Sequence, residues 1–195
     1  MHAITRWETL YPEDARIPTA LTSRALMRAA ACFAVDRAQW LLDLGCGAGR
    51  ATHFLAERGF AVVSVDASLA GLALAQRVAP QLPLLLGDAR QLALAACSVD
   101  GVYCFGPLHE FTGPTADADV AAILTETRRV LRPGGTLCLT VLAGEPEDGL
   151  PHVRLFTRAM LETALHPFTM VACELLNDVG CTGREGYRVW WAQAS

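Results

Sequence analysis

Two apolar runs separated by a glycine-rich turn constrain the fold of this chain more than any other feature. The first run, Leu41–Leu44, leads into glycines at positions 45, 47 and 49, and the second, Val62–Val65, ends at Asp66. A helix-like segment lies between them, and Asp66 stands 21 positions after Gly45. This spacing is typical of a β-strand, a glycine loop, a helix and a second strand whose carboxylate meets a ribose diol. The sequence therefore predicts a site for a nucleoside cofactor.

The positions of the glycines distinguish between cofactors. A dinucleotide fingerprint has the form G-x-G-x-x-G and requires a third glycine at position 50, where this chain has Arg50. The third glycine comes one residue earlier, and glycines in such a turn allow positive φ and a close approach of the backbone to a ligand. The pattern D-x-G-x-G-x-G from Asp43 to Gly49, with Asp66 behind it, resembles the first motif of class I S-adenosylmethionine-dependent methyltransferases. The alternative is a glycine turn that only packs a helix on a sheet.

The resemblance implies a role for each part of the motif. It implies that Asp43 meets the methionine part of S-adenosylmethionine, that Asp66 accepts both ribose hydroxyls, and that Asp88 with Ala89 reads the adenine edge. A carboxylate suits a diol because it offers several acceptor sites. A helix N-cap is the alternative for Asp66, and a turn carboxylate is the alternative for Asp88. The cofactor-binding residues that the resemblance implies are Asp43, Gly45, Cys46, Gly47, Gly49 (which allows helix packing), Asp66, Ala67, Asp88, Ala89 and Phe105.

The rest of the chain alternates between segments typical of strands and segments typical of helices. We expect strands at 40–44, 61–65, 82–86, 100–105 and 136–142, and helices at 18–34, 50–58, 68–78, 116–131 and 157–165. Ser68 is the expected N-cap of the helix that runs to 78. Such alternation predicts a parallel sheet with helices on both faces. Two late segments, 168–175 and 187–192, have no helix between them and predict a closing antiparallel pair.

These elements predict an α/β fold with a Rossmann-like seven-stranded methyltransferase sheet, mostly parallel, with an antiparallel last strand and helices on both faces. The resemblance covers residues 20–193 and is to the small single-domain branch, of the methyltransferase type 11/25 kind. Leu131–Gly135, before the fifth strand, resembles a further signature of the family. We expect one domain over residues 1–195, in which residues 1–18 form an N-terminal arm and a lid over the pocket.

Charge and hydropathy exclude several classes of protein. The 195 residues carry a net charge of −4, and the 16 arginines are scattered, without the concentrated basic face of a nucleic-acid binder. No apolar run approaches the roughly 18–20 residues of a membrane span, and the first residues lack the basic-then-apolar pattern of a signal peptide. We therefore expect a cytoplasmic protein that binds neither nucleic acid nor membrane.

The cysteines do not predict a metal site. The seven cysteines form no C-x-x-C pair and no zinc-like spacing, which favours reduced structural thiols. Cys104 and Cys138 fall in runs typical of buried strands, where cysteine behaves as a small apolar residue. Thiols that bind a soft metalloid substrate are the alternative, but no local cluster supports it.

The segment Phe105–Phe111 is the candidate for the reacting end of the site. Sheets of this kind bind ligands beyond the carboxyl ends of their strands, so this segment is expected to face the transferred methyl group. Its His109 is the candidate catalytic residue, because an ordinary pKa of about 6.5 suits a general base; a histidine that only shapes the wall is the alternative that we favour. The motif is not a zinc H-E-x-x-H site, because position 113 is a glycine. Trp7, Tyr11 and the loop 144–149 are candidates for the acceptor pocket.

These features predict an enzyme that transfers a methyl group from S-adenosylmethionine to a small-molecule acceptor and releases S-adenosylhomocysteine. Because the sulfonium is already activated, holding the nucleophile and the methyl group in line supplies much of the rate. One alternative is an NAD-dependent oxidoreductase, which Arg50 and the segment 133–135 oppose. Another is a non-catalytic S-adenosylmethionine-binding regulatory module. The acidic balance disfavours a nucleic-acid or protein substrate, and we expect a monomer or a homodimer.

Overall fold

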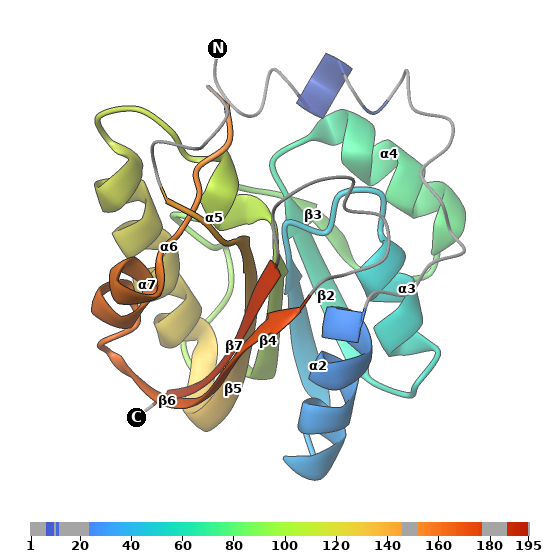
Figure 1. Ribbon diagram of the computed structural model, residues 1–195. Helices are drawn as coiled ribbons and strands as arrows, with labels where there is room; N and C mark the ends of the chain where they lie inside the picture. The colour runs from blue at the N-terminus through green and yellow to red at the C-terminus, as the bar shows by residue number, and fades with distance from the viewer. Residues whose placement is uncertain (1–6, 10, 12–23, 146–151, 177–186, 195) are drawn as a thin grey trace.

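The computed structural model describes residues 7–9, 11, 24–145, 152–176 and 187–194 (Figure 1). Its helices are α2 (Arg24–Val35), α3 (Arg50–Ala56), α4 (Leu69–Val78), α5 (Pro107–Glu110), α6 (Ala116–Val130) and α7 (Arg158–Ala164). Its strands are β1 (Trp40–Leu44), β2 (Ala61–Asp66), β3 (Leu84–Leu86), β4 (Val99–Phe105), β5 (Leu131–Leu142), β6 (Phe168–Leu176) and β7 (Tyr187–Ala194).

The strands form a sheet in the order β3-β2-β1-β4-β5-β7-β6. The first five strands in this order are parallel, whereas β7 runs antiparallel to both β5 and β6. The predicted α/β Rossmann-like fold, with helices packed on a parallel sheet, is confirmed. From β1 the successive strands are added on one side of the sheet up to β3, and from β4 they are added on the other side. In open α/β sheets, ligands bind beyond the carboxyl ends of the strands at such a reversal, which here lies between β1 and β4.

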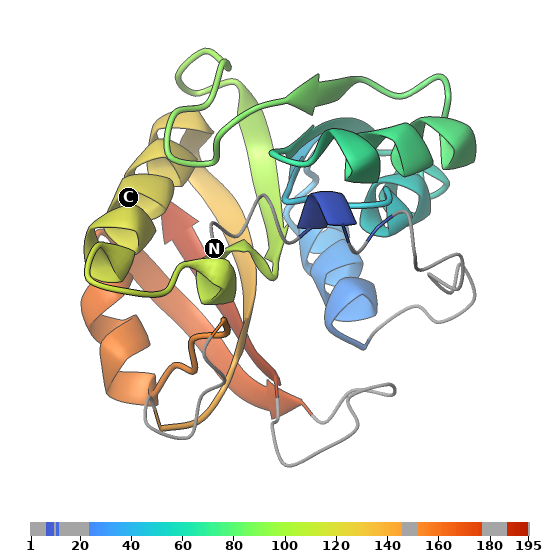
Figure 2. The same cartoon turned by 90° about the horizontal axis from the view of Figure 1, so that it is seen from above.

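The helices form two layers, one on each face of the sheet (Figures 1 and 2). On one face, α2 and α3 bury Phe33 and Leu55 against Leu41 of β1 and Tyr103 of β4. The larger core on the other face joins the sheet to α6 and α7, with Ile123 of α6 fully buried. Alternate residues of β1 and β4 therefore pack into different cores, as the two-residue period of a strand requires.

Side-chain caps and proline chemistry explain several element boundaries. Ser68 is the N-cap of α4, as expected, and its hydroxyl accepts the Gly71 amide at 3.0 Å. The strand predicted at 82–86 begins only at Leu84, because Pro83 has no amide to donate; its carbonyl accepts the Ser64 amide at 3.0 Å. At the start of β5, Gly134 has φ of +75°, which fits the turn that a Pro-Gly pair favours.

The helix α5 was not expected from the sequence. Gly106, with φ of +102°, turns the chain at the end of β4, and Pro107 occupies the first turn of the helix, where a fixed φ is suitable. A helix of four residues shows no apolar periodicity, so only its flanking residues could have indicated it.

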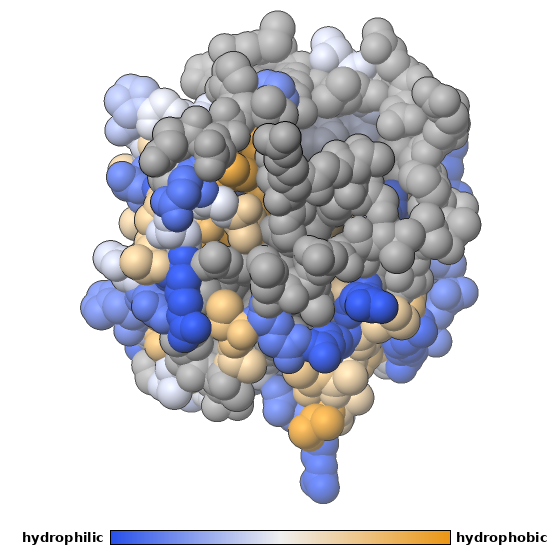
Figure 3. All heavy atoms as spheres, in the orientation of Figure 1, coloured by the Kyte–Doolittle hydropathy of each residue, from blue (hydrophilic) through white to orange (hydrophobic). Residues whose placement is uncertain are grey.

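The described surface mixes hydrophilic and apolar side chains. On the face drawn in Figure 3, hydrophilic residues lie along the lower part of the molecule with apolar residues between them. The most exposed large apolar side chains are Met27, Val35, Trp40, Leu69 and Leu86. In the ranges that the structure describes, no helix is both long and apolar enough to cross a membrane.

The position of β7 between β5 and β6 makes it essential to the sheet. A chain that ends at Leu176 lacks β7, so the edge of β5 is left unpaired and β6 loses its neighbour. We expect such a chain to lose its cooperative thermal transition, measured by circular dichroism. Val189 pairs with both Thr140 and Glu174, so Val189→Pro removes a ladder hydrogen bond and should be destabilising, whereas Val189→Thr keeps the amide and serves as the control. A cooperative transition in the truncated chain would mean that β7 is peripheral.

Candidate cofactor and acceptor site

One large cavity opens at the carboxyl ends of β1, β2 and β4. Its volume is about 1040 Å³, at the upper end of the range of roughly 300–1,000 Å³ for small-molecule sites. The sequence-predicted residues that line it are Asp43, Gly45, Cys46, Gly47, Asp66, Ala67, Asp88, Ala89, Phe105 and His109. The fold therefore brings together residues that are spread over more than sixty positions of the chain.

The glycine loop after β1 has the left-handed backbone that the sequence suggested. Gly45 and Gly47 have φ of +74° and +53°. A Cβ at Gly45 would lie 2.1 Å from the ring of Pro107, and one at Gly47 would lie 2.3 Å from the Tyr11 hydroxyl. Gly49 does not line the cavity; a Cβ there would lie 2.8 Å from Cβ of Ala75 in α4. Its lack of a side chain lets α3 and α4 approach each other, which is the helix-packing role predicted for this residue.

Asp43 is a buried carboxyl group at the end of β1. It is 2% exposed, and its Oδ2 accepts the hydroxyl of Thr52 in α3 at 2.6 Å. The Thr52 oxygen lies 2.8 Å from the Ser64 hydroxyl, which donates to it when Thr52 donates to Asp43. Burial raises the pKa of Asp43 to about 7, and the Thr52 hydrogen bond opposes this shift. A cationic group bound beside Asp43 would favour its ionised form.

Asp66 links the end of β2 to the glycine loop. Its Oδ2 accepts the Gly47 amide at 2.7 Å and its Oδ1 accepts the Ser68 amide at 2.8 Å. Burial raises the pKa of Asp66, and these amide hydrogen bonds act in the opposite direction. Since a carboxylate has about four acceptor sites, Asp66 keeps acceptor capacity for a ligand hydroxyl.

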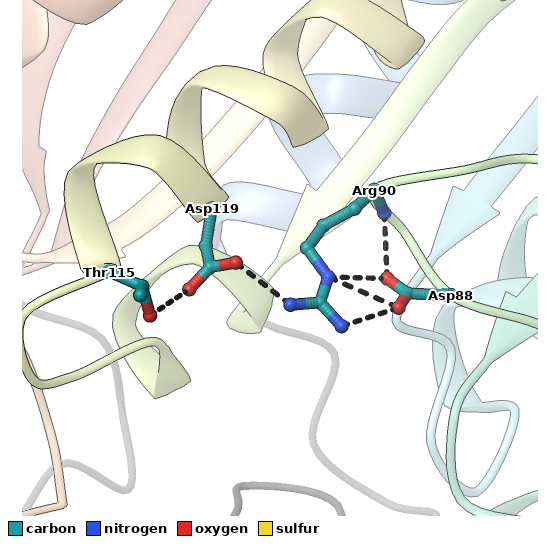
Figure 4. Close-up of polar contacts among 4 residues, drawn as sticks. All are labelled: Asp88, Arg90, Thr115 and Asp119. Carbon is teal, nitrogen blue, oxygen red and sulfur yellow. Dashed lines mark hydrogen bonds and ion pairs between the residues drawn. The ribbon is translucent and has the colours of Figure 1, made fainter.

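Asp88 lies at the cavity, but its carboxylate binds Arg90. The Arg90 amide and Nε lie 2.8 and 3.0 Å from Oδ1, and Nη2 lies 2.6 Å from Oδ2 (Figure 4). The same guanidinium reaches Oδ1 of Asp119 at 2.8 Å. It lowers the pKa of both carboxyl groups. Asp88 thus pairs with an arginine in the turn after β3 and also faces the cavity, and its contact with an adenine edge stays a prediction.

Residues of α5, together with Trp7 and Tyr11 near the N-terminus, also line the cavity. His109 is 9% exposed, its Nε2 lies 3.7 Å from Oε1 of Glu110, and its carbonyl accepts the Arg154 amide at 2.8 Å. The rings of Trp7 and Tyr11 line the cavity with centroids 5.1 Å apart. The aromatic rings and the His109–Glu110 pair thus line the same cavity.

The N-terminal residues are attached to α4. Glu8 accepts the Ala70 amide at 3.3 Å, and Figure 2 shows residues 7–9 (dark blue) beside α4. Burial, followed by the charge of Asp66, raises the pKa of Tyr11, so this phenol is neutral. Of the predicted acceptor loop 144–149, Gly144 and Glu145 do not line the cavity, and 146–149 lie outside the described residues.

Other lining residues were not identified from the sequence. Arg90, Tyr103 and Asp119 all line the cavity. Glu110 also lines it and lies in the predicted segment Phe105–Phe111, although no role was assigned to it, and no sequence signal connects Asp119 with Arg90.

The described cysteines are free thiols, and Cys181 lies outside the described residues. Burial, with the nearby charges of Asp43 and Asp66, raises the pKa of Cys46, so its thiol is protonated at neutral pH. Within the described ranges, no group of three or more His, Cys, Asp or Glu residues could hold a metal ion.

The raised pKa of Asp43 predicts a pH-dependent stability. The pKa of Asp43 is near 3.8 in the unfolded chain and about 7 in the folded protein. The folded state therefore binds the proton more tightly, so the protonated carboxyl group stabilises the fold at low pH. This contribution is lost as the pH rises through 7. Relative to the wild type, Asp43→Asn should gain stability between about pH 4 and 7, by roughly 1 kcal/mol or more, since one pKa unit corresponds to about 1.4 kcal/mol. Denaturant unfolding across this range measures it. The exposed Asp117→Asn is the control, and a difference that does not vary with pH would contradict the assignment.

Comparisons with known proteins agree with this geometry. Residues 42–139 match a family described as a methyltransferase domain. An uncharacterized methyltransferase from Synechocystis sp. is 38% identical over 110 residues, which cover 56% of this chain and only 50% of that protein. A malonyl-[acyl-carrier protein] O-methyltransferase from Serratia marcescens is 30% identical over 176 residues, covering 75% of this chain and 67% of the relative.

Solved structures share the fold. The crystal structure of Burkholderia thailandensis 1,6-didemethyltoxoflavin-N1-methyltransferase, with bound 1,6-didemethyltoxoflavin and S-adenosylhomocysteine, has a TM-score of 0.74 at 22% identity. The match covers 98% of this chain and 86% of that chain. With the family match over half of the sequence, these similarities confirm the resemblance inferred from Asp43–Gly49 and Asp66. The chain belongs to the family of class I S-adenosylmethionine-dependent methyltransferases.

Proposed function

We propose that this protein transfers a methyl group from S-adenosylmethionine to a small-molecule acceptor. The observation that carries the proposal is the cavity at the carboxyl ends of β1, β2 and β4, where a buried carboxyl group, a glycine loop and a second carboxylate adjoin an aromatic wall. The volume of about 1040 Å³ supports a site for a cofactor and an acceptor together. The Burkholderia enzyme, which has the same fold, binds both kinds of molecule.

The chain offers a group for each part of the cofactor. Asp43 would bind the ammonium of the methionine part, because a buried carboxylate favours a cationic partner. The loop around Gly47 would lie along the same part, and the free acceptor sites of Asp66 would take the ribose hydroxyls. Asp88 and Ala89 would border the adenine.

Placement accounts for most of the catalysis in this proposal. The bound cofactor supplies an activated methyl group, and the acceptor wall holds the nucleophile in line with it. His109 and Glu110 belong to this wall. We favour a wall-shaping role for His109, since thiolate or carboxylate acceptors are already nucleophilic; a general-base role is the alternative.

The remaining expectations complete the proposal. Residues 1–18 would form a lid within a single domain of 1–195; of this segment the structure describes only 7–9 and 11, and the contacts of Glu8 with Ala70 and of Tyr11 with the glycine loop support the proposal. We retain the expected monomer or homodimer, the cytoplasmic location and the absence of nucleic-acid and membrane partners as predictions. An NAD-dependent oxidoreductase is disfavoured by Arg50, which stands where the dinucleotide motif needs glycine.

Cofactor identity can be tested by ligand-induced stabilisation. S-adenosylhomocysteine should raise the melting temperature by mass action, whereas NAD and NADP should not. Asp66→Asn and Asp66→Ala should weaken its binding by about 1–3 kcal/mol, because polar groups lose a charged partner. Isothermal titration calorimetry measures the affinity, with Asp117→Asn as the control. Equal stabilisation by NAD would overturn the cofactor assignment.

The role of His109 can be tested by steady-state kinetics with a panel of thiols, amines, phenols and carboxylates. If His109 shapes the wall, His109→Ala should mainly raise KM for the acceptor, as loss of uniform binding does. A general base would instead contribute about 10²–10⁴-fold to kcat. His53→Ala is the control, because His53 is half-exposed on α3 and pairs with Glu57 outside the cavity. A thousandfold loss of kcat at saturating acceptor, with cofactor affinity intact, would refute the wall-shaping role.

A further inference from the structure

Glu110 is an acid of the cavity to which the proposed cofactor contacts assign no role. The acidic residues that line the cavity among the described residues are Asp43, Asp66, Asp88, Glu110 and Asp119. The first three are assigned to the methionine, ribose and adenine parts of the cofactor, and Asp119 binds Arg90 at 2.8 Å. The side chain of Glu110 is only 11% accessible, so its carboxylate lines the cavity with little contact to water.

The neighbours of Glu110 place its carboxylate near the carboxyl end of β4. Its Oε1 lies 3.7 Å from Nε2 of His109, and a Cβ at Gly106 would lie 3.8 Å from the same Nε2. Gly106 directly follows β4, and its amide donates to the Thr140 carbonyl of β5 at 3.3 Å. In the sheet, β4 lies on the other side of β1 from β2 and β3, which lead to the acids assigned to ribose and adenine. Glu110 thus lies on the side where the proposed cofactor would present its methyl group.

The lining that adjoins α5 suits a flat apolar molecule. Tyr103 and Phe105 of β4 line the cavity with nearly parallel rings, whose centroids are 6.4 Å apart and whose planes differ by 15°. Leu142, the last residue of β5, and Val153 also line it. Aromatic and aliphatic side chains bind a ring by excluding water from its faces. The cavity therefore offers an apolar surface together with the Glu110 carboxylate.

We propose that Glu110 is a specificity-determining residue that selects an acceptor whose reacting atom is the nitrogen of an amino group on a flat apolar body. The inference rests on the proposed function. The bound ammonium first releases a proton to water, and the nitrogen lone pair then forms the bond to the methyl carbon. The carbon–sulfur bond breaks with its electron pair remaining on sulfur. The positive charge thus moves from sulfur to nitrogen, where the carboxylate of Glu110 accepts a hydrogen bond from the N–H group.

Charge decides which acceptors Glu110 favours. A carboxylate or thiolate acceptor would have to bind beside a second negative charge, whereas an amine becomes an ammonium that a poorly hydrated carboxylate stabilises. The imidazole of His109 balances this charge only when it is protonated, and 3.7 Å is longer than a hydrogen bond. A neutral amine is nucleophilic without a base, so the wall-shaping role of His109 is compatible with this acceptor class.

Binding to the complex with S-adenosylhomocysteine tests the inference without turnover. Isothermal titration calorimetry compares benzylamine, 2-phenylethylamine and tryptamine with benzoate, phenylacetate and indole-3-acetate, which carry the same rings. The wild type should bind the amines about tenfold or more tightly than the matched carboxylates, because like charges in contact are costly. Glu110→Gln keeps the size of the side chain and removes its charge. It should weaken amine binding about ten- to a hundredfold, the range for a hydrogen bond to a charged group, and leave the affinity for S-adenosylhomocysteine unchanged.

Methyl transfer provides a second readout. With S-adenosylmethionine and the amine that binds most tightly, mass spectrometry should find the methyl group on nitrogen. Glu110→Gln should lower kcat/KM for this amine by a factor similar to its loss of affinity. A wild type that methylates the matched carboxylates in preference to the amines would contradict the proposed acceptor class.

Glu162→Gln is the matched control, because the same chemical change is made on α7, where Glu162 pairs with Arg158 outside the cavity. Glu110→Asp keeps the charge on a shorter side chain and should keep the preference for amines. Together with the wild-type preference, it keeps the test decisive if thermal denaturation shows that Glu110→Gln does not fold.

The outcomes separate this inference from the proposed function. Amines that bind no better than their matched carboxylates, or equally well to Glu110→Gln and to the control, would overturn the role of Glu110 while S-adenosylhomocysteine still binds. Absence of binding by every amine would have the same meaning. A wild type that does not bind S-adenosylhomocysteine would overturn the proposed function as well.

Discussion

The hydrogen bond from the Gly47 amide to the Asp66 carboxylate is the contact on which the site depends. It joins the loop after β1 to the end of β2, so the glycine loop and the acid keep one relative position. The Ser68 amide binds the other oxygen of Asp66, and the Ser68 hydroxyl in turn caps α4. The carboxylate therefore orients two backbone segments and still has acceptor sites that face the cavity.

Near this contact the chain buries polar side chains, and removing them from water lowers the stability of the fold. Asp43 is buried beside Thr52 and Ser64, and its ionised form is penalised by desolvation. The hydroxyl pair offsets only part of this penalty, because it supplies one donor to the carboxylate. Such a carboxyl group is suited to a cationic ligand group, so the same feature that lowers stability at neutral pH supports the proposed binding of an amino acid moiety.

The sequence correctly predicted the helices and strands whose positions depend on neighbouring residues alone. The apolar run at β1 and the Ser68 cap of α4 lie where the sequence indicated, because period and capping depend on neighbouring residues. The short helix α5 escaped prediction, since four residues carry no periodicity and Gly106 reverses the chain. The sequence also placed the start of β5 too late. Leu131 already pairs with Val99 of β4, and the register between the two strands shifts between Val99 and Gly101. Such a shift depends on both strands, so no local sequence signal reveals it.

The sequence by itself determined the alternation of strands and helices, the glycine loop and the acid at the end of β2, because the spacing from Gly45 to Asp66 has few structural solutions. Only the tertiary structure decided what each acid contacts. Asp88 looked the same in sequence whether or not it paired with an arginine, and the position of that arginine depends also on Asp119, which is 29 positions from Arg90. Contacts across such a distance follow from how α6 packs on the sheet, and no local pattern encodes them.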